Sequence, residues 1–251
     1  MIVLKSAREI ELMREGGQIL AAVMDFLPGF VKSGMSTLEI DEEVESFIKK
    51  KGAKPAFKGY RGFPATVCIS INEEIVHGIP SPHRRIKEGD IVGLDLGCIV
   101  DGYYADCAFT LAVGPVPDDV QKLLDVTRES LDLAIEACVP GRRLSDVSHA
   151  VQRHVEAHGL SIVRAFVGHG IGRALHEDPQ VPNFGDPGRG PQLRAGMVLA
   201  IEPMVTMGSW EVRILDDGWT AVTKDGSLAA HFEHTIAVTE RGPDVLTRKA
   251  A

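Results

Sequence analysis

Positive charge is scarce in this sequence relative to negative charge. Its 251 residues include 27 Lys and Arg against 35 Asp and Glu, which gives a formal net charge of −8 at pH 7. A protein that binds the phosphate backbone of a nucleic acid usually presents a basic face. We therefore expect no nucleic-acid partner. The acidic balance fits either simple solubility or carboxylates gathered around a cation.

Long apolar runs are also missing. No stretch approaches the roughly 18 apolar residues that a membrane helix needs, and charge enters the N-terminal segment at Lys5. We therefore expect neither a signal peptide nor a membrane span. The four cysteines form no C-x-x-C pair and no compact framework: Cys68, Cys98, Cys107 and Cys138. This spacing argues against a zinc motif and favours reduced thiols in a cytoplasmic protein.

Linkers and low-complexity segments are missing too, so a single domain over residues 1–251 is predicted. Helical periodicity and start signals predict four helices, over residues 6–28, 36–52, 117–140 and 145–158. The first two begin with a serine followed three residues later by glutamate, which is capping-box spacing. The first should end at Pro28-Gly29, and Ser145 should cap the fourth.

Strands are predicted where β-branched and apolar residues concentrate. These runs are residues 65–76, 89–97 and 103–113, and the last two are joined by Asp101-Gly102, a hairpin signal. Helices and strands together indicate a mixed α/β (α+β) class. The hairpin should bring Asp95 and Asp106 close to each other.

The second half of the chain resembles the first over a short stretch. In Ile86–Asp95 and in Leu193–Glu202, a glycine is followed by a five-residue strand and then an acid. Ahead of each acid lies a histidine with a proline three residues later. This repeat predicts two related halves, roughly 1–115 and 116–251. A ligand site would form at their junction.

Four carboxylates lie inside otherwise apolar, strand-like runs: Asp95, Asp106, Glu202 and Glu233. A carboxylate buried without partners costs several kcal/mol or stays protonated. His169 stands between two glycines directly after another β-type run. The five residues carry about four negative charges, enough to balance two divalent cations and leave a hydroxide between them.

The donor set limits the choice of metal without fixing it. Oxygen-rich coordination with one imidazole suits manganese, iron or cobalt as well as zinc. Two such ions would lower the pKa of a shared water and stabilise a tetrahedral oxyanion. His77 and His176 are additional imidazoles, suited to hydrogen-bonding a scissile carbonyl or passing a proton, although each could also be a solvated loop residue.

Six ordered motifs resemble those of the methionine aminopeptidases of type I: Asn72-Glu-Glu-Ile-Val-His77-Gly-Ile-Pro80, Asp95-Leu-Gly through Tyr103-Tyr-Ala-Asp106, Gly168-His-Gly-Ile-Gly172, His176-Glu, Ile201-Glu-Pro203 and Phe232-Glu-His-Thr235. The resemblance covers essentially the whole chain. It implies the pita-bread fold, in which helices cover a curved antiparallel sheet built from two pseudo-symmetric halves. It also implies release of N-terminal methionine from nascent chains, with small second residues preferred, by a cytoplasmic monomer that contacts the ribosome transiently.

The resemblance assigns roles to the motif residues. Asp95 would chelate one metal ion, His169 and Glu202 the other, and Asp106 and Glu233 would bridge both. Glu202 would also handle the proton of the attacking hydroxide. His77 would steady the leaving nitrogen and His176 the peptide carbonyl. The substrate's free α-amine would take an open metal position, so that only the first residue is removed.

A methionine pocket is implied as well, and its matching positions here are Tyr60, Phe63, Cys68 and Trp219. Aromatic and sulfur-containing surroundings suit a thioether, and plain core packing would explain the same residues. The chain departs from the family at Leu175, where phenylalanine is common. Only 31 positions separate Glu202 from Glu233, too few for the helical insertion of the type II branch.

Three other functions compete with this one. A proline-directed relative, such as prolidase or aminopeptidase P, would use the same five ligands but carries a large N-terminal domain. A non-catalytic pita-bread binding protein would usually have lost ligands. Dinucleotide binding is suggested by Gly168-x-Gly170, but the third glycine stands at 172 rather than 173, and His169 intrudes.

Overall fold

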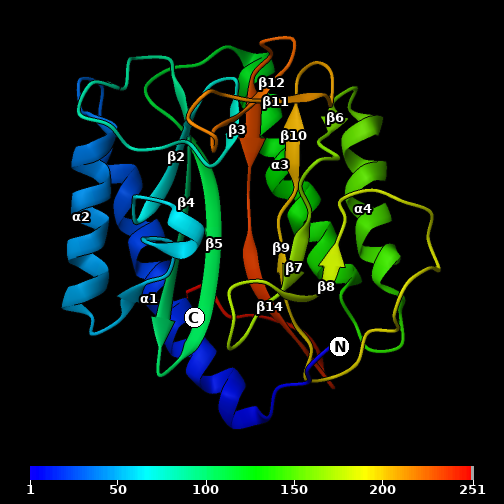
Figure 1. Cartoon of the computed structure of the whole chain (residues 1–251). Helices are drawn as coiled ribbons and strands as arrows, with labels where there is room; N and C mark the ends of the chain where they lie inside the picture. The colour runs from blue at the N-terminus through cyan, green and yellow to red at the C-terminus, as the bar shows by residue number, and fades with distance from the viewer. Residues whose placement is uncertain (250–251) are drawn as a thin grey trace.

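The structure is a computed structural model that describes residues 1–249. Its α-helices in this range are α1 (Ala7–Phe30), α2 (Thr37–Lys50), α3 (Asp118–Ala137) and α4 (Leu144–Ala157), and η1 (Tyr60–Gly62) is a 3-10 turn (Figure 1). All four predicted helices are therefore present. In the described range, no helix combines the length and the apolar character needed to cross a membrane.

The strands are short except for one hairpin. They are β1 (Lys54–Pro55), β2 (Val67–Ile71), β3 (Glu74–Val76), β4 (Ile91–Val100), β5 (Tyr103–Ala112), β6 (Ser161–Ile162), β7 (Gly168–Gly170), β8 (Glu177–Val181), β9 (Val198–Ile201), β10 (Met204–Thr206), β11 (Val212–Ile214), β12 (Ala221–Thr223), β13 (Ala229–His231), β14 (His234–Thr239) and β15 (Gly242–Val245). The strand pairs are antiparallel. Helices with antiparallel sheets confirm the predicted mixed class.

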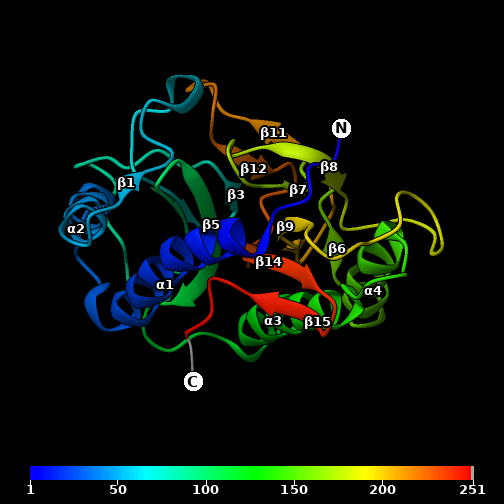
Figure 2. The same ribbon diagram turned by 90° about the horizontal axis from the view of Figure 1, so that it is seen from below.

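Two sheets carry most of the architecture. The first sheet has the order β1-β4-β2 with β5 paired to β4, and the second has the order β15-β14-β9-β7-β8. Two smaller sheets, β13-β10-β6 and β11-β12-β3, complete the strands. Helix α1 packs on β4 and β5, and α3 packs on β9, β10 and β13. Figure 2 shows α1 crossing β5 and α3 lying beside β15.

The helix starts follow the capping boxes, and one predicted end is wrong. Ser6 accepts from the backbone of Glu9, and the Glu9 carboxylate accepts from the Ser6 backbone; Ser36 and Glu39 repeat this pattern. Helix α1 does not stop at Pro28 but runs to Phe30, with Val31 N–H donating to Leu27 O at 2.9 Å. Pro28 removes one donor near the end of the helix, where the remaining turn still closes.

The start of α4 also differs from the prediction. The helix begins at Leu144 after Arg143, whose backbone N–H donates to the Asp146 carboxylate at 2.8 Å. Ser145 is already helical, and its hydroxyl accepts instead from Arg189 N at 2.7 Å. The aspartate three residues after the cap satisfies the free N–H, so Ser145 is not the N-cap.

The two main sheets are joined edge to edge along β5. Glu233 and Ala108 exchange backbone hydrogen bonds of 2.8 and 3.3 Å. Two residues before and two residues after Ala108 on β5, the pairing continues through the side-chain hydroxyl of a threonine in place of a backbone group. Thr235 Oγ1 accepts from Asp106 N at 3.0 Å and donates to Asp106 O at 2.8 Å. Thr110 Oγ1 makes the equivalent pair with His231, at 3.0 and 2.9 Å. We call this row the junction ladder.

Candidate metal centre and active site

The β4–β5 hairpin supplies the first two carboxylates. Asp95 is paired with Ala108, and Asp106 with Gly97. Residues directly opposite in an antiparallel pair point to the same face, and so do residues two apart. Asp95 and Asp106 are therefore diagonal neighbours on one face, as the hairpin predicted. Gly97, directly opposite Asp106, leaves room for the Phe57 ring, because a Cβ on Gly97 would lie 2.8 Å from that ring.

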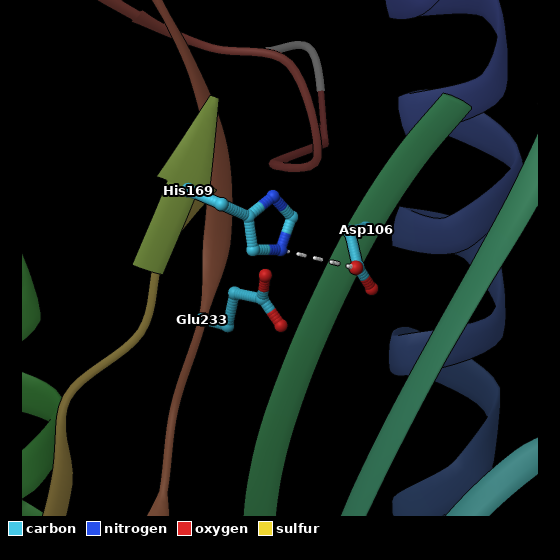
Figure 3. A group of neighbouring side chains, drawn as sticks. All are labelled: Asp106, His169 and Glu233. Atoms are coloured by element: carbon cyan, nitrogen blue, oxygen red, sulfur yellow. Dashed lines mark ion pairs between the residues drawn. The ribbon is translucent and has the colours of Figure 1, made fainter. Parts of the chain in front are cut away.

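The second sheet brings the other three candidate ligands to the same place. His169 on β7 is paired with Ala200 on β9. Glu202 follows the last residue of β9, and Glu233 precedes the first residue of β14, directly after the pair Ile201–His234. Figure 3 shows Asp106, His169 and Glu233 pointing toward one another from three separate segments. One ligand atom from each lies within 4.8 Å of the others.

The imidazole of His169 is oriented by its own strand. Its Nδ1 lies 2.9 Å from the carbonyl oxygen of Gly170, and because a carbonyl only accepts, Nδ1 carries the proton. Nε2 then presents a lone pair toward the carboxylates. It lies 3.5 Å from Glu202 Oε1 and 4.0 Å from Asp106 Oδ2. A ring N–H held by a backbone carbonyl fixes the tautomer and orientation of the imidazole, as is usual for a histidine that binds a metal.

The tight turn around His169 depends on its glycines. A Cβ on Gly168 would come 2.4 Å from Ala200 O, and a Cβ on Gly170 would come 2.1 Å from Asp178 O. Both are closer than any side chain tolerates. The glycines thus let β7 pass between β8 and β9 and hold His169 at the ligand cluster.

The carboxylates are held in surroundings that oppose their charge. Burial raises the pKa of Asp95 to about 7, against a hydrogen bond from Cys68 that lowers it. Burial and the neighbouring acids also raise the pKa values of Asp106, Glu202 and Glu233 well above their ordinary range. Without a cation, burial in this cluster favours the protonated form of each carboxyl group.

Their hydrogen bonding fits a metal better than a packed core. Asp95 Oδ1, Asp106 Oδ1 and Glu233 Oε1 are buried and have no hydrogen-bond partner within the protein. Buried polar atoms are normally satisfied. Oxygen atoms that converge with a neutral imidazole, and that lack protein donors, are suited to divalent cations.

Two further histidines line the same cavity, which measures about 190 Å³. His77 follows β3 with a left-handed φ of 63°, a strained conformation that functional sites often hold. Its ring contacts Phe166 edge-on, with centroids 5.4 Å apart. Burial lowers the pKa of His77 to about 4, and His176 adds to this. His77 is therefore neutral at pH 7.

His176 lies beside the ligand cluster. Its ring centroid is 4.3 Å from that of His169, and its Nδ1 is 2.8 Å from the Tyr60 hydroxyl. Burial, and then the charge of Arg61, lower the pKa of His176. His169 and His176, seven positions apart in the sequence, thus lie side by side in the wall of the cavity. His77 reaches the same cavity from the end of β3.

All four residues expected to contact methionine line this cavity: Tyr60, Phe63, Cys68 and Trp219. Phe63 and Trp219 meet edge-on at 5.2 Å. Leu175, the departure from the family pattern, is buried in the same wall. Cys68 is paired with Asp95 across β2 and β4, so its side chain lies on the same face as that carboxylate and lines the cavity beside the candidate metal centre.

Sequence reasoning missed three residues of this region. His231 is buried, with Nε2 unpartnered by hydrogen bonds and 3.7 Å from Glu202 Oε2. Burial lowers the pKa of His231 to about 3. Phe166 and Arg61 line the cavity near His77 and His176. His231 stands two residues before Glu233, and residues two apart in an extended segment point to the same face. This spacing could have indicated His231 from the sequence.

The comparisons agree over nearly the whole chain. The model of metallopeptidase family M24 matches residues 11–240. Methionine aminopeptidase 1 of Bacillus subtilis is 54% identical over 248 residues, which is 99% of this chain and 100% of that protein. The crystal structure of methionine aminopeptidase from Thermotoga maritima superposes with a TM-score of 0.98 at 48% identity, covering 99% of this chain and 100% of that one.

A prolidase from Pyrococcus furiosus is more distant. It matches with a TM-score of 0.79 at 24% identity, over 99% of this chain but only 66% of its own, so the likeness is one of fold. These structural matches confirm the expected pita-bread fold. With buried carboxylates and a metal-ready histidine gathered between two sheets, and with a family match over most of its length, the chain belongs to metallopeptidase family M24.

Proposed function

We propose that this protein removes the N-terminal methionine from nascent polypeptides and prefers a small second residue. Relatives about half identical over nearly their full length bear the name methionine aminopeptidase. The observation that carries the proposal is the convergence, in one cavity, of five candidate ligands and two neutral histidines beside an apolar pocket. A metal-dependent hydrolase needs each of these parts.

The proposed cofactor is a pair of divalent ions, drawn from cobalt, manganese, iron and zinc. Asp95 would hold one ion, His169 and Glu202 the other, and Asp106 and Glu233 both. Bound there, the ions would supply a hydroxide at neutral pH and a positive charge beside the scissile carbonyl. The unpartnered carboxylate oxygens and the fixed Nε2 lone pair of His169 support this assignment.

The remaining roles are proposed for the protein's own side chains. Glu202 accepts the proton of the attacking nucleophile and returns it to the leaving amine. His77 hydrogen-bonds the leaving nitrogen, and His176 donates to the carbonyl oxygen as negative charge develops. Their depressed pKa values support neutral imidazoles at pH 7. Tyr60, Phe63, Cys68 and Trp219 would surround the methionine side chain.

The proposed setting is the cytoplasm, where the chain would act as a monomer on emerging polypeptides and contact the ribosome transiently. The acidic net charge supports the absence of nucleic-acid binding by the protein itself. A proline-directed activity is the second candidate. The full-length match to methionine aminopeptidases, against the partial coverage of prolidases, favours the first.

One experiment separates these functions. The protein is stripped with a chelator and reloaded with each divalent ion in turn. Release of the first residue is then measured from Met-Ala-Ser, Leu-Ala-Ser and Pro-Ala-Ser, and from a dipeptide ending in proline. We expect selective cleavage of Met-Ala-Ser that depends on metal. Cleavage of only the proline dipeptide would establish the second candidate, and no cleavage with any ion would exclude both.

A further inference from the structure

The two histidines of the 169–176 stretch are held by opposite kinds of partner. His169 Nδ1 faces the carbonyl oxygen of Gly170, which can only accept a hydrogen bond. His176 Nδ1 faces the hydroxyl of Tyr60 at 2.8 Å, and a hydroxyl can donate. Partners of this kind determine which ring nitrogen of a neutral histidine carries the proton.

We infer that Tyr60 is a positioning residue for His176: its hydroxyl donates to Nδ1 and thereby fixes the tautomer in which Nε2–H is the donor toward the substrate. The inference rests on the proposed role of His176. It gives Tyr60 a task beyond lining the methionine pocket. The two histidines would then present opposite groups to the site, a lone pair from His169 and an N–H from His176.

The proposed role of His176 favours this direction of the hydrogen bond. The carbonyl oxygen of a bound peptide can only accept a hydrogen bond, so the ring nitrogen that faces it has to carry the proton. Nδ1 is already occupied by the Tyr60 hydroxyl, which leaves Nε2 for the substrate. The proton is therefore on Nε2, and Nδ1 accepts from Tyr60.

Tyr60 is itself held firmly for this purpose. Its ring stacks on the ring of His176, with centroids 5.4 Å apart and an interplanar angle of 27°. The guanidinium of Arg61 lies 5.3 Å from the centroid of the Tyr60 ring, within cation–π range. Tyr60 also begins the η1 turn, which Phe63 N–H closes by donating to Tyr60 O at 2.9 Å. The hydroxyl is thus aimed by backbone, stacking and charge.

The tautomer can be read directly by ¹⁵N NMR of histidine-labelled protein, both metal-free and loaded with diamagnetic zinc. His176→Gln assigns the signals. We expect wild-type His176 to show a pyridine-type Nδ1 and a pyrrole-type Nε2, whereas His169 shows the reverse. In Tyr60→Phe the His176 signals should move toward the average of two tautomers. A pyrrole-type Nδ1 on His176 in the wild type would overturn the inference.

A double-mutant cycle tests the consequence for catalysis. Tyr60→Phe should lower kcat for Met-Ala-Ser about tenfold with KM and bound metal nearly unchanged. In a His176→Gln background, the same change should cost almost nothing further, because Tyr60 acts through His176. Phe63→Leu is the matched control, since it alters the same pocket without touching His176. Its effect should fall mainly on KM and should persist in the His176→Gln background.

The outcomes separate this inference from the function on which it rests. If His176→Gln leaves turnover of Met-Ala-Ser intact, the proposed role of His176 is wrong. If His176→Gln impairs turnover but Tyr60→Phe costs as much with it as without it, Tyr60 only packs against substrate and the positioning role is wrong. The NMR measurement on the wild type decides the tautomer independently of the turnover of the variants.

Discussion

The ammonium of Lys5 lies 2.5 Å from the carboxylate of Glu177, and both side chains are largely buried, at 4% and 15% exposure. Glu177 follows His176 directly, and it also accepts from Ala174 N at 3.2 Å. The N-terminal segment thus fastens the loop that carries His176. This contact joins residues 172 positions apart.

Removing the ammonium group of Lys5 should destabilise the protein. Lys5→Met leaves Glu177 buried without its partner, so we expect a loss of about 3 kcal/mol in the free energy of unfolding, measured with denaturant. Lys5→Met combined with Glu177→Gln should recover most of that loss. Lys224→Met is the control, because both side chains of the Lys224–Glu211 pair are about half exposed, at 59% and 49%, and the pair should contribute less than about 0.5 kcal/mol. Equal losses in the two single variants would contradict the prediction.

His77→Ala should impair turnover without removing metal. Its imidazole lines the cavity, and our proposal gives it the leaving nitrogen rather than an ion. We expect kcat/KM for Met-Ala-Ser to fall by about a hundredfold or more, while metal content stays near that of wild type. His83→Ala, an exposed histidine on the following loop, should have no effect. Loss of metal from His77→Ala would show that a ligand had been taken for a catalytic group.

The metal-free protein should lose stability as pH rises above about 6.5. A histidine with a lowered pKa, such as His77, binds fewer protons in the folded state than in the unfolded state. It therefore makes the free energy of unfolding rise with pH, but only up to its ordinary pKa of 6.5. Asp95, whose pKa burial raises to about 7, still holds protons in the folded state that the unfolded state has released, and burial raises the pKa of Glu233 in the same direction. Folding then binds protons, so stability falls as pH increases.

Thermal unfolding between about pH 6.5 and 8 measures this trend. With saturating divalent ion the decline should disappear, because metal replaces the protons on the carboxylates. Asp95→Asn should flatten part of the metal-free decline. A metal-free melting temperature that rises over this range would contradict the assignment of protonated, buried carboxylates.

Gly170→Ala should disrupt the His169 strand. A Cβ there meets the backbone oxygen of Asp178 at 2.1 Å, and backbone cannot move aside as a flexible side chain can. We expect a loss of at least about 2 kcal/mol in stability and weaker metal binding. Gly29→Ala is the matched control, since nothing lies within 4 Å and the residue is helical. It should stabilise the protein by about 0.5 kcal/mol. Titration calorimetry and denaturant unfolding measure both effects.

Local signals sufficed for much of the fold. The capping boxes at Ser6 and Ser36, and the hairpin around Asp101-Gly102, depend on neighbours in sequence, and the structure has all three. The acids inside strands predicted a site because burial without partners is costly. The expected α/β class, the pita-bread fold and membership of the metallopeptidases are confirmed.

Contacts between distant segments could not be predicted in the same way. Pro28 is a helix-end signal in the sequence, yet the turn beyond it closes through the hydrogen bond from Val31 N–H to Leu27 O. His231 shows no motif of its own and gains its neighbours only when β13 lies beside β10 and β5. From the sequence, Tyr60 was predicted only as an aromatic residue of the methionine pocket. Its hydrogen bond to His176 could not be foreseen, because the two residues lie 116 positions apart. The metal ligation and catalytic roles remain predictions.

The junction ladder sets the spacing between two of the candidate ligands. Asp106 and Glu233 stand on its two strands, so their separation is set by the pitch of paired backbone and by two threonine hydroxyls. Widening or closing that gap would break backbone hydrogen bonds. The ligand cluster is therefore assembled by folding itself and does not wait for an ion to draw it together.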